Sequence, residues 1–203
     1  MKCNSRPKAV LAVLLAISLL ATGCTAQWIS VALADLPVLL QMALNIGSLV
    51  TTLRSGQDIT SAETTAIQNI SAEASKDLNL LQALYNQYQA SPSASALQKI
   101  QSTVADINQN LPALLQAAHI ADPVLAARMS SAVNLILTTV TSFAALIPQA
   151  SGMPTSRITA ASPIGKKATI PQPQDLKKQW NQTVCGATGK ASLDSAFSVC
   201  PLK

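Results

Sequence analysis

The chain is poor in the residues from which most catalytic and metal sites are built. Its 203 residues contain a single histidine, and only 11% are charged. No Glu-x-x-His ligand pattern occurs, and no Gly-x-Ser-x-Gly nucleophile elbow. A lone histidine has no partner that sequence places beside it, so we interpret His119 as structural. The sequence therefore predicts a protein that is not an enzyme and that holds no metal and no cofactor.

Aromatic residues are also scarce, with two each of Trp, Tyr and Phe. Trp180 and Phe197 are isolated, and no nucleic-acid-binding motif accompanies them, so we expect no nucleic acid partner. Residues 186–190, Gly-Ala-Thr-Gly-Lys, share composition with a phosphate-binding loop. Their spacing is wrong, and Ala191 stands where such a loop requires Ser or Thr. We therefore predict no phosphate site there.

The first residues have the layout of an export signal. Lys2, Arg6 and Lys8 make a basic start, and an uncharged apolar run follows from Ala9 to Ala21. The run is too short to cross a bilayer comfortably, and small residues follow it, which is typical of a secretory signal.

Residues 21–24, Ala-Thr-Gly-Cys, resemble the lipobox of bacterial lipoproteins. The resemblance implies that residues 1–23 are a signal peptide, that Cys24 is acylated, and that the mature chain is anchored to a membrane of the bacterial cell envelope. It places the folded part on the periplasmic or outer side. Three acyl chains on one cysteine anchor far more firmly than a single myristoyl group.

Two details qualify the resemblance. Ala21 stands where the family prefers Leu, Val or Ile, so ordinary signal cleavage after Ala26 is the alternative. Thr25, rather than Asp, follows the cysteine. If the host has two membranes, this resembles the pattern that sorts lipoproteins to the outer membrane.

Four cysteines are present, and two of them lie near the C-terminus. Cys185 and Cys200 are separated by fourteen residues, without any Cys-x-x-Cys spacing. In an oxidising envelope compartment such a pair predicts a disulfide rather than a redox motif. Closing this loop would stabilise the fold by roughly 3 kcal/mol in the chain-entropy model. A metal site, the alternative, would need more ligands.

Over residues 29–147 apolar residues recur every three or four positions, which is the spacing of one helix face, and strand signals are weak. Thr60 and Glu63 are placed to form a capping box, and Asp122 precedes a proline at a predicted helix start. Short connections favour antiparallel neighbours. We therefore expect an all-α fold, an up-down antiparallel four-helix bundle over residues 24–148.

Two prolines interrupt this pattern. Pro37 and Pro112 each either start a helix or kink one. They lie in segments 36–43 and 111–118, which match at six of eight positions. The match is short and its flanks do not extend it, so both a duplicated hairpin and chance similarity between Leu- and Ala-rich segments stay open.

The C-terminal part differs in composition from the bundle. Residues 149–173 are rich in Pro, Ser and Thr and are predicted to be a linker. Residues 174–203 are predicted to hold one short helix, over 175–184, and the Cys185–Cys200 loop. Residues 149–203 carry seven basic and two acidic side chains, against four and seven in residues 24–148. A solvated, irregular tail is the favoured interpretation, and contact with anionic lipid or cell-wall polymers is the alternative.

Two classes of function fit these patterns. The first is a lipid-anchored helical bundle that works as a structural or adaptor module, in contact with other envelope proteins or cell-wall polymers. The second is a membrane-inserting or pore-forming protein that uses residues 36–53 and 130–149, which are free of charge over a length near that of a spanning helix. Helices that are apolar nearly all round also suit a bundle core, and we favour the first class. Sequence does not separate an apolar ligand between the helices from ordinary packing.

Overall fold

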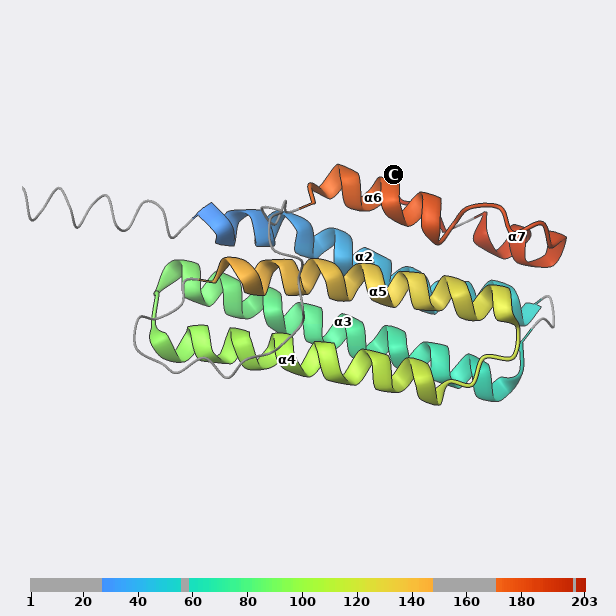
Figure 1. Ribbon diagram of the computed structural model, residues 1–203, viewed down its shortest axis with the longest axis horizontal. Helices are drawn as coiled ribbons and strands as arrows, with labels where there is room; N and C mark the ends of the chain where they lie inside the picture. Colours follow the sequence, from blue (N-terminus) through green and yellow to red (C-terminus); the bar gives the residue numbers. More distant parts are fainter. Residues whose placement is uncertain (1–26, 56–58, 148–170, 199) are drawn as a thin grey trace, which may run out of the picture.

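The computed structural model describes residues 27–55, 59–147, 171–198 and 200–203, and within these ranges it is helical with no strand. Six helices follow one another along the chain (Figure 1). Four are long and two are short: α2 (Gln27–Ser55), α3 (Ser61–Ala90), α4 (Ala94–Ala117), α5 (Pro123–Leu146), α6 (Pro173–Thr183) and α7 (Ala191–Phe197). The all-α prediction is confirmed. The predicted signal peptide and most of the predicted linker lie outside the described residues.

The predicted helix starts are present with their capping bonds. The Glu63 amide donates to Thr60 Oγ1 (3.2 Å), and the Thr60 amide donates to Glu63 Oε2 (2.8 Å), which completes the capping box of α3. At the start of α5, Asp122 Oδ1 accepts from two amides of the first turn, and Pro123 occupies the first helical position. The free amides of both helix starts are therefore satisfied locally.

Neither of the two prolines begins a helix. Pro37 lies inside α2, and Pro112 lies inside α4. The two matching segments thus occupy different places, one in the first half of its helix and the other at the end of its helix. The fold leaves the origin of the match open.

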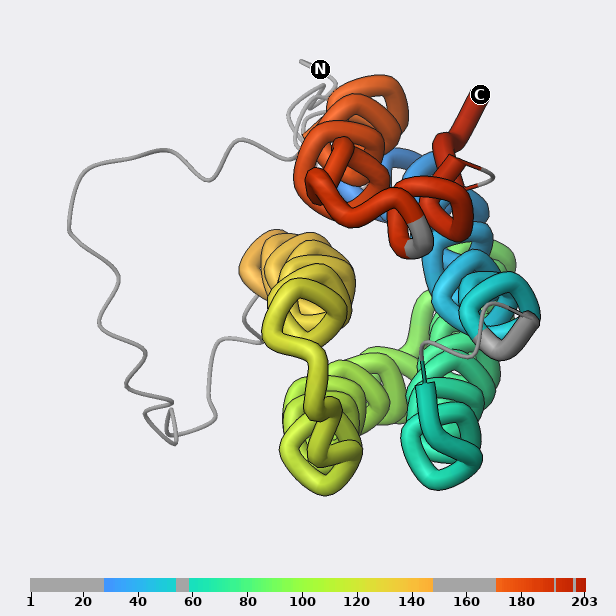
Figure 2. Tube along the Cα trace, turned by 90° about the vertical axis from the view of Figure 1, so that its right-hand side faces the viewer, coloured from blue at the N-terminus to red at the C-terminus, as the bar shows by residue number. Residues whose placement is uncertain are grey.

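The long helices run side by side in alternating directions. Ser71 of α3 contacts Ala43 of α2, and Tyr85, further along α3, contacts Trp28 near the start of α2, which fixes these two helices as antiparallel. Helix α3 packs on α4, α4 on α5, and α5 returns to α2. Seen end-on, the four helices surround a common core (Figure 2).

The C-terminal helices lie over α2 and α5. Helix α6 contacts both of them, and α7 contacts α2. In Figures 1 and 2 the two short helices sit against one side of the array of long helices. We call α6, α7 and the residues that join and follow them (Pro173–Lys203) the cap segment.

The short helix predicted over residues 175–184 is present as α6, and the rest of the cap segment is more ordered than the sequence predicts. Helix α6 begins at Pro173, and the predicted Cys185–Cys200 loop contains a second helix, α7. Trp180 and Phe197 are at most 1% exposed and belong to the same apolar cluster as the long helices. The expected irregular tail is corrected in this part, because apolar residues too few to form a core of their own become buried against the existing one.

Candidate functional site

The predicted disulfide residues come together at the edge of the core. The sulfur atoms of Cys185 and Cys200 are 2.07 Å apart and their Cα atoms 5.6 Å apart, which is the geometry of a disulfide bond. Cys200 is buried, and Cys185 packs against the core. Cys24, the predicted lipidation residue, lies outside the described residues.

Helix α6 holds the last residues of the chain. The Trp180 indole N–H donates to the Cys200 carbonyl (3.2 Å). The Asn181 side chain donates to the Leu202 carbonyl (3.0 Å) and accepts from the Leu202 amide (2.8 Å). Lys177 Nζ donates to the carbonyl of Lys203 (2.6 Å). The disulfide therefore closes a segment that side chains of α6 also bind along its length.

Two polar side chains of the long helices bind the cap segment. The Arg128 guanidinium donates to the Gly186 and Ala187 carbonyls at 3.0 and 3.2 Å, and to the Thr183 carbonyl at the end of α6. A cation at this position is favourable because the C-terminus of a helix carries partial negative charge. The Asn45 amide of α2 donates to the Cys200 carbonyl (3.0 Å).

The segment that shares composition with a phosphate loop binds a carboxylate of this chain instead. Asp194 accepts from the amide (2.5 Å) and hydroxyl (2.7 Å) of Thr188 and from the amide of Gly189 (3.2 Å). These bonds, the Thr188 hydroxyl first, lower the pKa of Asp194. Gly189 has φ +79°, a conformation that glycine adopts without strain. The Thr188 and Gly189 amides of this segment are therefore occupied by a carboxylate of the chain itself.

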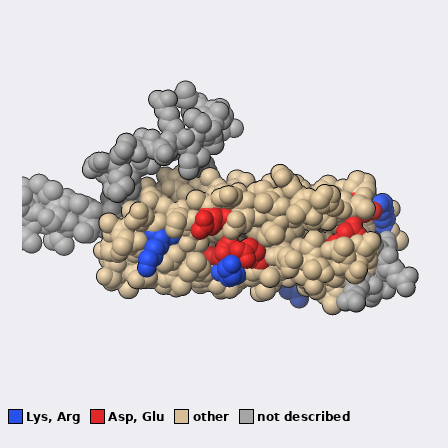
Figure 3. Space-filling view, turned by 90° about the horizontal axis from the view of Figure 1, so that it is seen from below, with Lys and Arg blue, Asp and Glu red and all other residues tan. Residues whose placement is uncertain are grey.

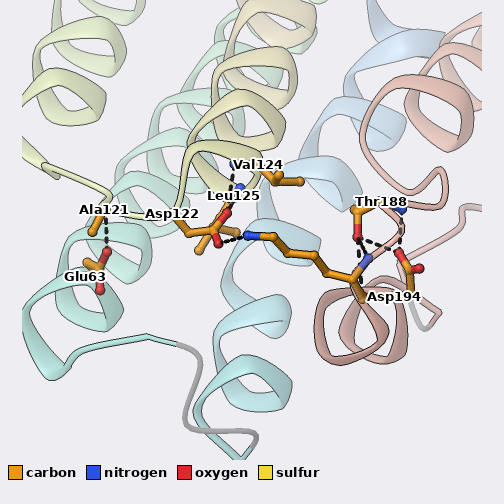
Figure 4. A network of polar contacts seen from close by, with 8 residues as sticks. Glu63, Ala121, Asp122, Val124, Leu125, Thr188 and Asp194 are labelled. Atoms are coloured by element: carbon orange, nitrogen blue, oxygen red, sulfur yellow. Dashed lines mark hydrogen bonds and ion pairs between the residues drawn. The ribbon is translucent and has the colours of Figure 1, made fainter.

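A polar network ties the helix starts to the cap segment at the end of the array where α3 and α5 begin (Figure 4). Glu63 accepts from the Ala121 amide in the α4–α5 connection (2.7 Å), and this bond is the main reason that its pKa is lowered. Asp122 pairs with Lys190 of the cap segment, which lowers the pKa of Asp122. Glu63 thus joins the start of α3 to the α4–α5 connection, and Asp122 joins that connection to the cap segment.

Asp35 is the residue that sequence reasoning missed. It is fully buried in α2, and neither carboxylate oxygen has a hydrogen-bond partner among the described residues. Burial raises its pKa to about 6. Its position in an otherwise apolar stretch was visible in the sequence, and it follows the same three- and four-residue spacing as the buried residues Ala32, Leu39 and Met42.

Aromatic residues gather at the opposite end of the array, where α2 begins. The Trp28 ring lies 5.5 Å from Tyr85 and 6.0 Å from Tyr88, and Tyr85 lies 6.5 Å from Phe143, measured between ring centroids. The Trp28 indole N–H and the Tyr85 hydroxyl are buried without a partner in the described part of the chain. Burial raises the pKa of Tyr85 above its usual range.

His119 has a local role. It is exposed, its Nδ1 lies 2.8 Å from the Ala117 carbonyl, and its φ of 44° places it in the left-handed region just after α4 ends. This is the conformation in which helices commonly terminate. No group of three His, Cys, Asp or Glu side chains able to hold a metal occurs in the described ranges.

Two helices are long and apolar enough to cross a membrane, by length and composition only. They are α2 over Trp28–Leu53, with a mean hydropathy of 1.7, and α5 over Pro123–Leu146, with a mean hydropathy of 1.5. Core helices of soluble proteins satisfy the same criterion.

No protein-family description, curated protein or solved structure matches the chain.

Proposed function

We propose that this protein is a lipid-anchored module of the bacterial cell envelope, in which the long helices form an up-down four-helix bundle that contacts other envelope proteins or cell-wall polymers. The observation that carries the proposal is the basic and apolar N-terminus ending in Ala-Thr-Gly-Cys at residues 21–24. An extracytoplasmic location also agrees with a Cys185–Cys200 pair at bonding distance, because disulfides persist in oxidising compartments.

The anchor would hold the bundle close to the bilayer. Helix α2 begins at Gln27, three residues after Cys24, and an extended chain spans at most about 3.6 Å per residue. The start of α2 would therefore lie within roughly 11 Å of the acylated cysteine. At this end Tyr88, which is only partly buried, packs beside the buried Trp28, and tyrosine is enriched at membrane interfaces.

The sparsely charged surface supports the proposed role as an interaction module. The face in Figure 3 bears a few acidic and basic side chains, and most of it consists of other residues. One surface cleft lies between α3 and α4, beside Asn69, Asn110 and Leu114. A sparsely charged surface fits contact with proteins or neutral polymers.

The anchor is tested by Cys24→Ser with metabolic labelling by palmitate and membrane fractionation. We expect the variant to lose the label and to leave the membrane fraction, whereas persistence there with an unchanged precursor mass would count against the lipid anchor. Cys3→Ser, in the segment to be removed, is the matched control and should label normally. A labelled Cys24→Ser variant, or an unlabelled parent protein, would refute the proposal.

A further inference from the structure

We propose that the seam between α2 and α5 is a bilayer-binding surface, which the cap segment covers for as long as the Cys185–Cys200 disulfide is closed. The inference goes beyond the lipid anchor at Cys24, since it concerns a second contact with lipid made by the helices themselves. It rests on the composition of the two helices, on how their polar groups are bonded and on what holds the cap segment in place.

The two helices with the highest hydropathy are neighbours in space. The spans Trp28–Leu53 and Pro123–Leu146 are the two apolar enough to cross a membrane, and α2 contacts α5. No charged residue occurs in α2 after Asp35 until Arg54, or in α5 after Arg128. The charge-free stretches of these two helices are therefore adjacent, and their length and composition are compatible with hydrocarbon.

Several hydroxyl groups on these helices donate hydrogen bonds to backbone carbonyls of their own helix, as polar groups in a bilayer must. In α2, Ser48 donates to the Asn45 carbonyl (2.9 Å) and Thr51 to the Ser48 carbonyl (2.8 Å). In α5, Thr139 and Ser142 donate to carbonyls four residues earlier, both at 2.8 Å. A hydroxyl that bonds its own helix needs no water, so its transfer into the bilayer costs little.

The cap segment lies on this seam. Val38, Asn45 and Leu49 form one stripe of α2, at spacings of seven and four, and Asn45 binds the carbonyl of Cys200. Val38 and Leu49 are buried. On α5, Arg128 binds the end of α6, and Leu135 and Thr139 on the same stripe line a cleft against α6. The cap segment therefore contacts both helices, and its removal would uncover the parts of α2 and α5 that it contacts.

The cap segment depends on its disulfide. Its helices have 11 and 7 residues, below the length at which an isolated helix is stable in water. When the bond closes, the two thiols lose two protons and two electrons to the disulfide of an exchange partner, which leaves as a dithiol. The crosslink spans 15 residues, and a loop of that size changes an opening equilibrium by about 100-fold. Reduction should therefore favour opening of the cap segment by about that factor while the long helices stay folded.

The test uses residues 24–203 with Cys24→Ser, which retain every described helix and carry no acyl group. Amide hydrogen exchange and flotation with phosphatidylethanolamine–phosphatidylglycerol vesicles are measured with and without a phosphine reductant. We expect reduction to raise exchange in α6 and α7 about 100-fold, to leave α3 protected, and to move the protein from the dense to the floating fraction. Cys185→Ser/Cys200→Ser should float without reductant.

Two further variants identify the surface. Arg128→Gln weakens the docking of α6 with the disulfide intact and should give partial flotation. Leu44 is an apolar residue of α2 that lies outside the seam and is 55% exposed. Leu44→Ser should therefore leave reductant-dependent flotation unchanged. The proposal is overturned if α6 stays protected after reduction, if the cap segment opens without flotation, if α3 loses protection together with α6, or if Leu44→Ser abolishes binding. These outcomes do not depend on acylation, so they are distinct from failure of the lipid anchor.

Discussion

At the scale of the single residue, the buried carboxylate of Asp35 lowers the stability of the fold. A carboxylate without a partner in an apolar interior is costly, and the protein responds by holding the proton more tightly, so that the pKa rises to about 6. The unfolded value is near 3.8. Near neutral pH the ionised Asp35 therefore destabilises the fold. In mild acid its carboxyl group is protonated in the folded chain, and the destabilisation is smaller.

Asp35→Asn should remove a pH dependence of stability. Because the folded chain binds the proton more tightly than the unfolded chain, the free energy of unfolding contributed by this group falls as the pH rises from about 4 to about 7, by roughly 1 to 3 kcal/mol. Urea unfolding across this range should show that fall in the parent and not in the variant. Asp106→Asn, at an exposed site, is the control and should keep it. Identical profiles for Asp35→Asn and the parent would contradict this account.

At the scale of the element, α2 and α3 pack closely because small residues face one another. A Cβ atom on Gly47 would lie 2.6 Å from Ser71 Oγ and 3.2 Å from Ser71 Cβ. The same hydroxyl donates to the Ala43 carbonyl across the interface (2.7 Å). Gly47 is therefore required by the approach of another helix, although glycine weakens α2 as an isolated helix.

Gly47→Ala should destabilise the protein by about 1 kcal/mol, even though alanine favours the helix by a similar amount, because Ser71 has to turn away and lose its bond to Ala43. The same substitution in a Ser71→Ala background should cost less. Chemical denaturation of the four proteins in this double-mutant cycle measures the coupling, which we expect to be about 1 to 2 kcal/mol. Strict additivity would show that the two side chains do not meet.

At the scale of the whole molecule, connections far apart in sequence meet at the end of the array where α3 and α5 begin. Glu63 joins the start of α3 to the connection before α5, and Asp122 joins that connection to Lys190 in the cap segment. The lowered pKa values of both carboxylates mean that they stabilise the fold as anions. Their contribution is lost as the pH falls below about 4.

Glu63→Gln should cost about 1 to 2 kcal/mol at pH 7, because a charge-assisted bond to the Ala121 amide becomes a neutral one and the capping box weakens. Glu73→Gln is a matched control on the same helix. Glu73 pairs with the exposed Lys76 on the same helix, so we expect a change within about 0.5 kcal/mol. Thermal or urea unfolding compares the two. Equal effects would show that the Glu63 bond adds nothing beyond a surface pair.

Local signals explain why the helix starts could be predicted. A Thr–Glu capping box at residues 60–63 and an Asp–Pro start at 122–123 act within one turn, so they determine where a helix begins without help from the rest of the fold. The Cys185–Cys200 pairing was predictable for a different reason, since only these two cysteines remain after the candidate signal peptide and Cys24. Cys24 itself stays a prediction.

Sequence by itself determined that this chain is helical, where α3 and α5 begin and which cysteines pair, because caps, apolar spacing and cysteine count are local or countable. Only the tertiary structure decided that the buried Asp35 carboxylate meets no hydrogen-bond partner among the described residues, that α7 forms inside the disulfide loop and that the cap segment lies over α2 and α5. A short helix such as α7 is not stable alone, and whether a buried carboxylate meets a partner depends on which helices surround it. Those outcomes arise from the packing of distant segments, which no local pattern encodes.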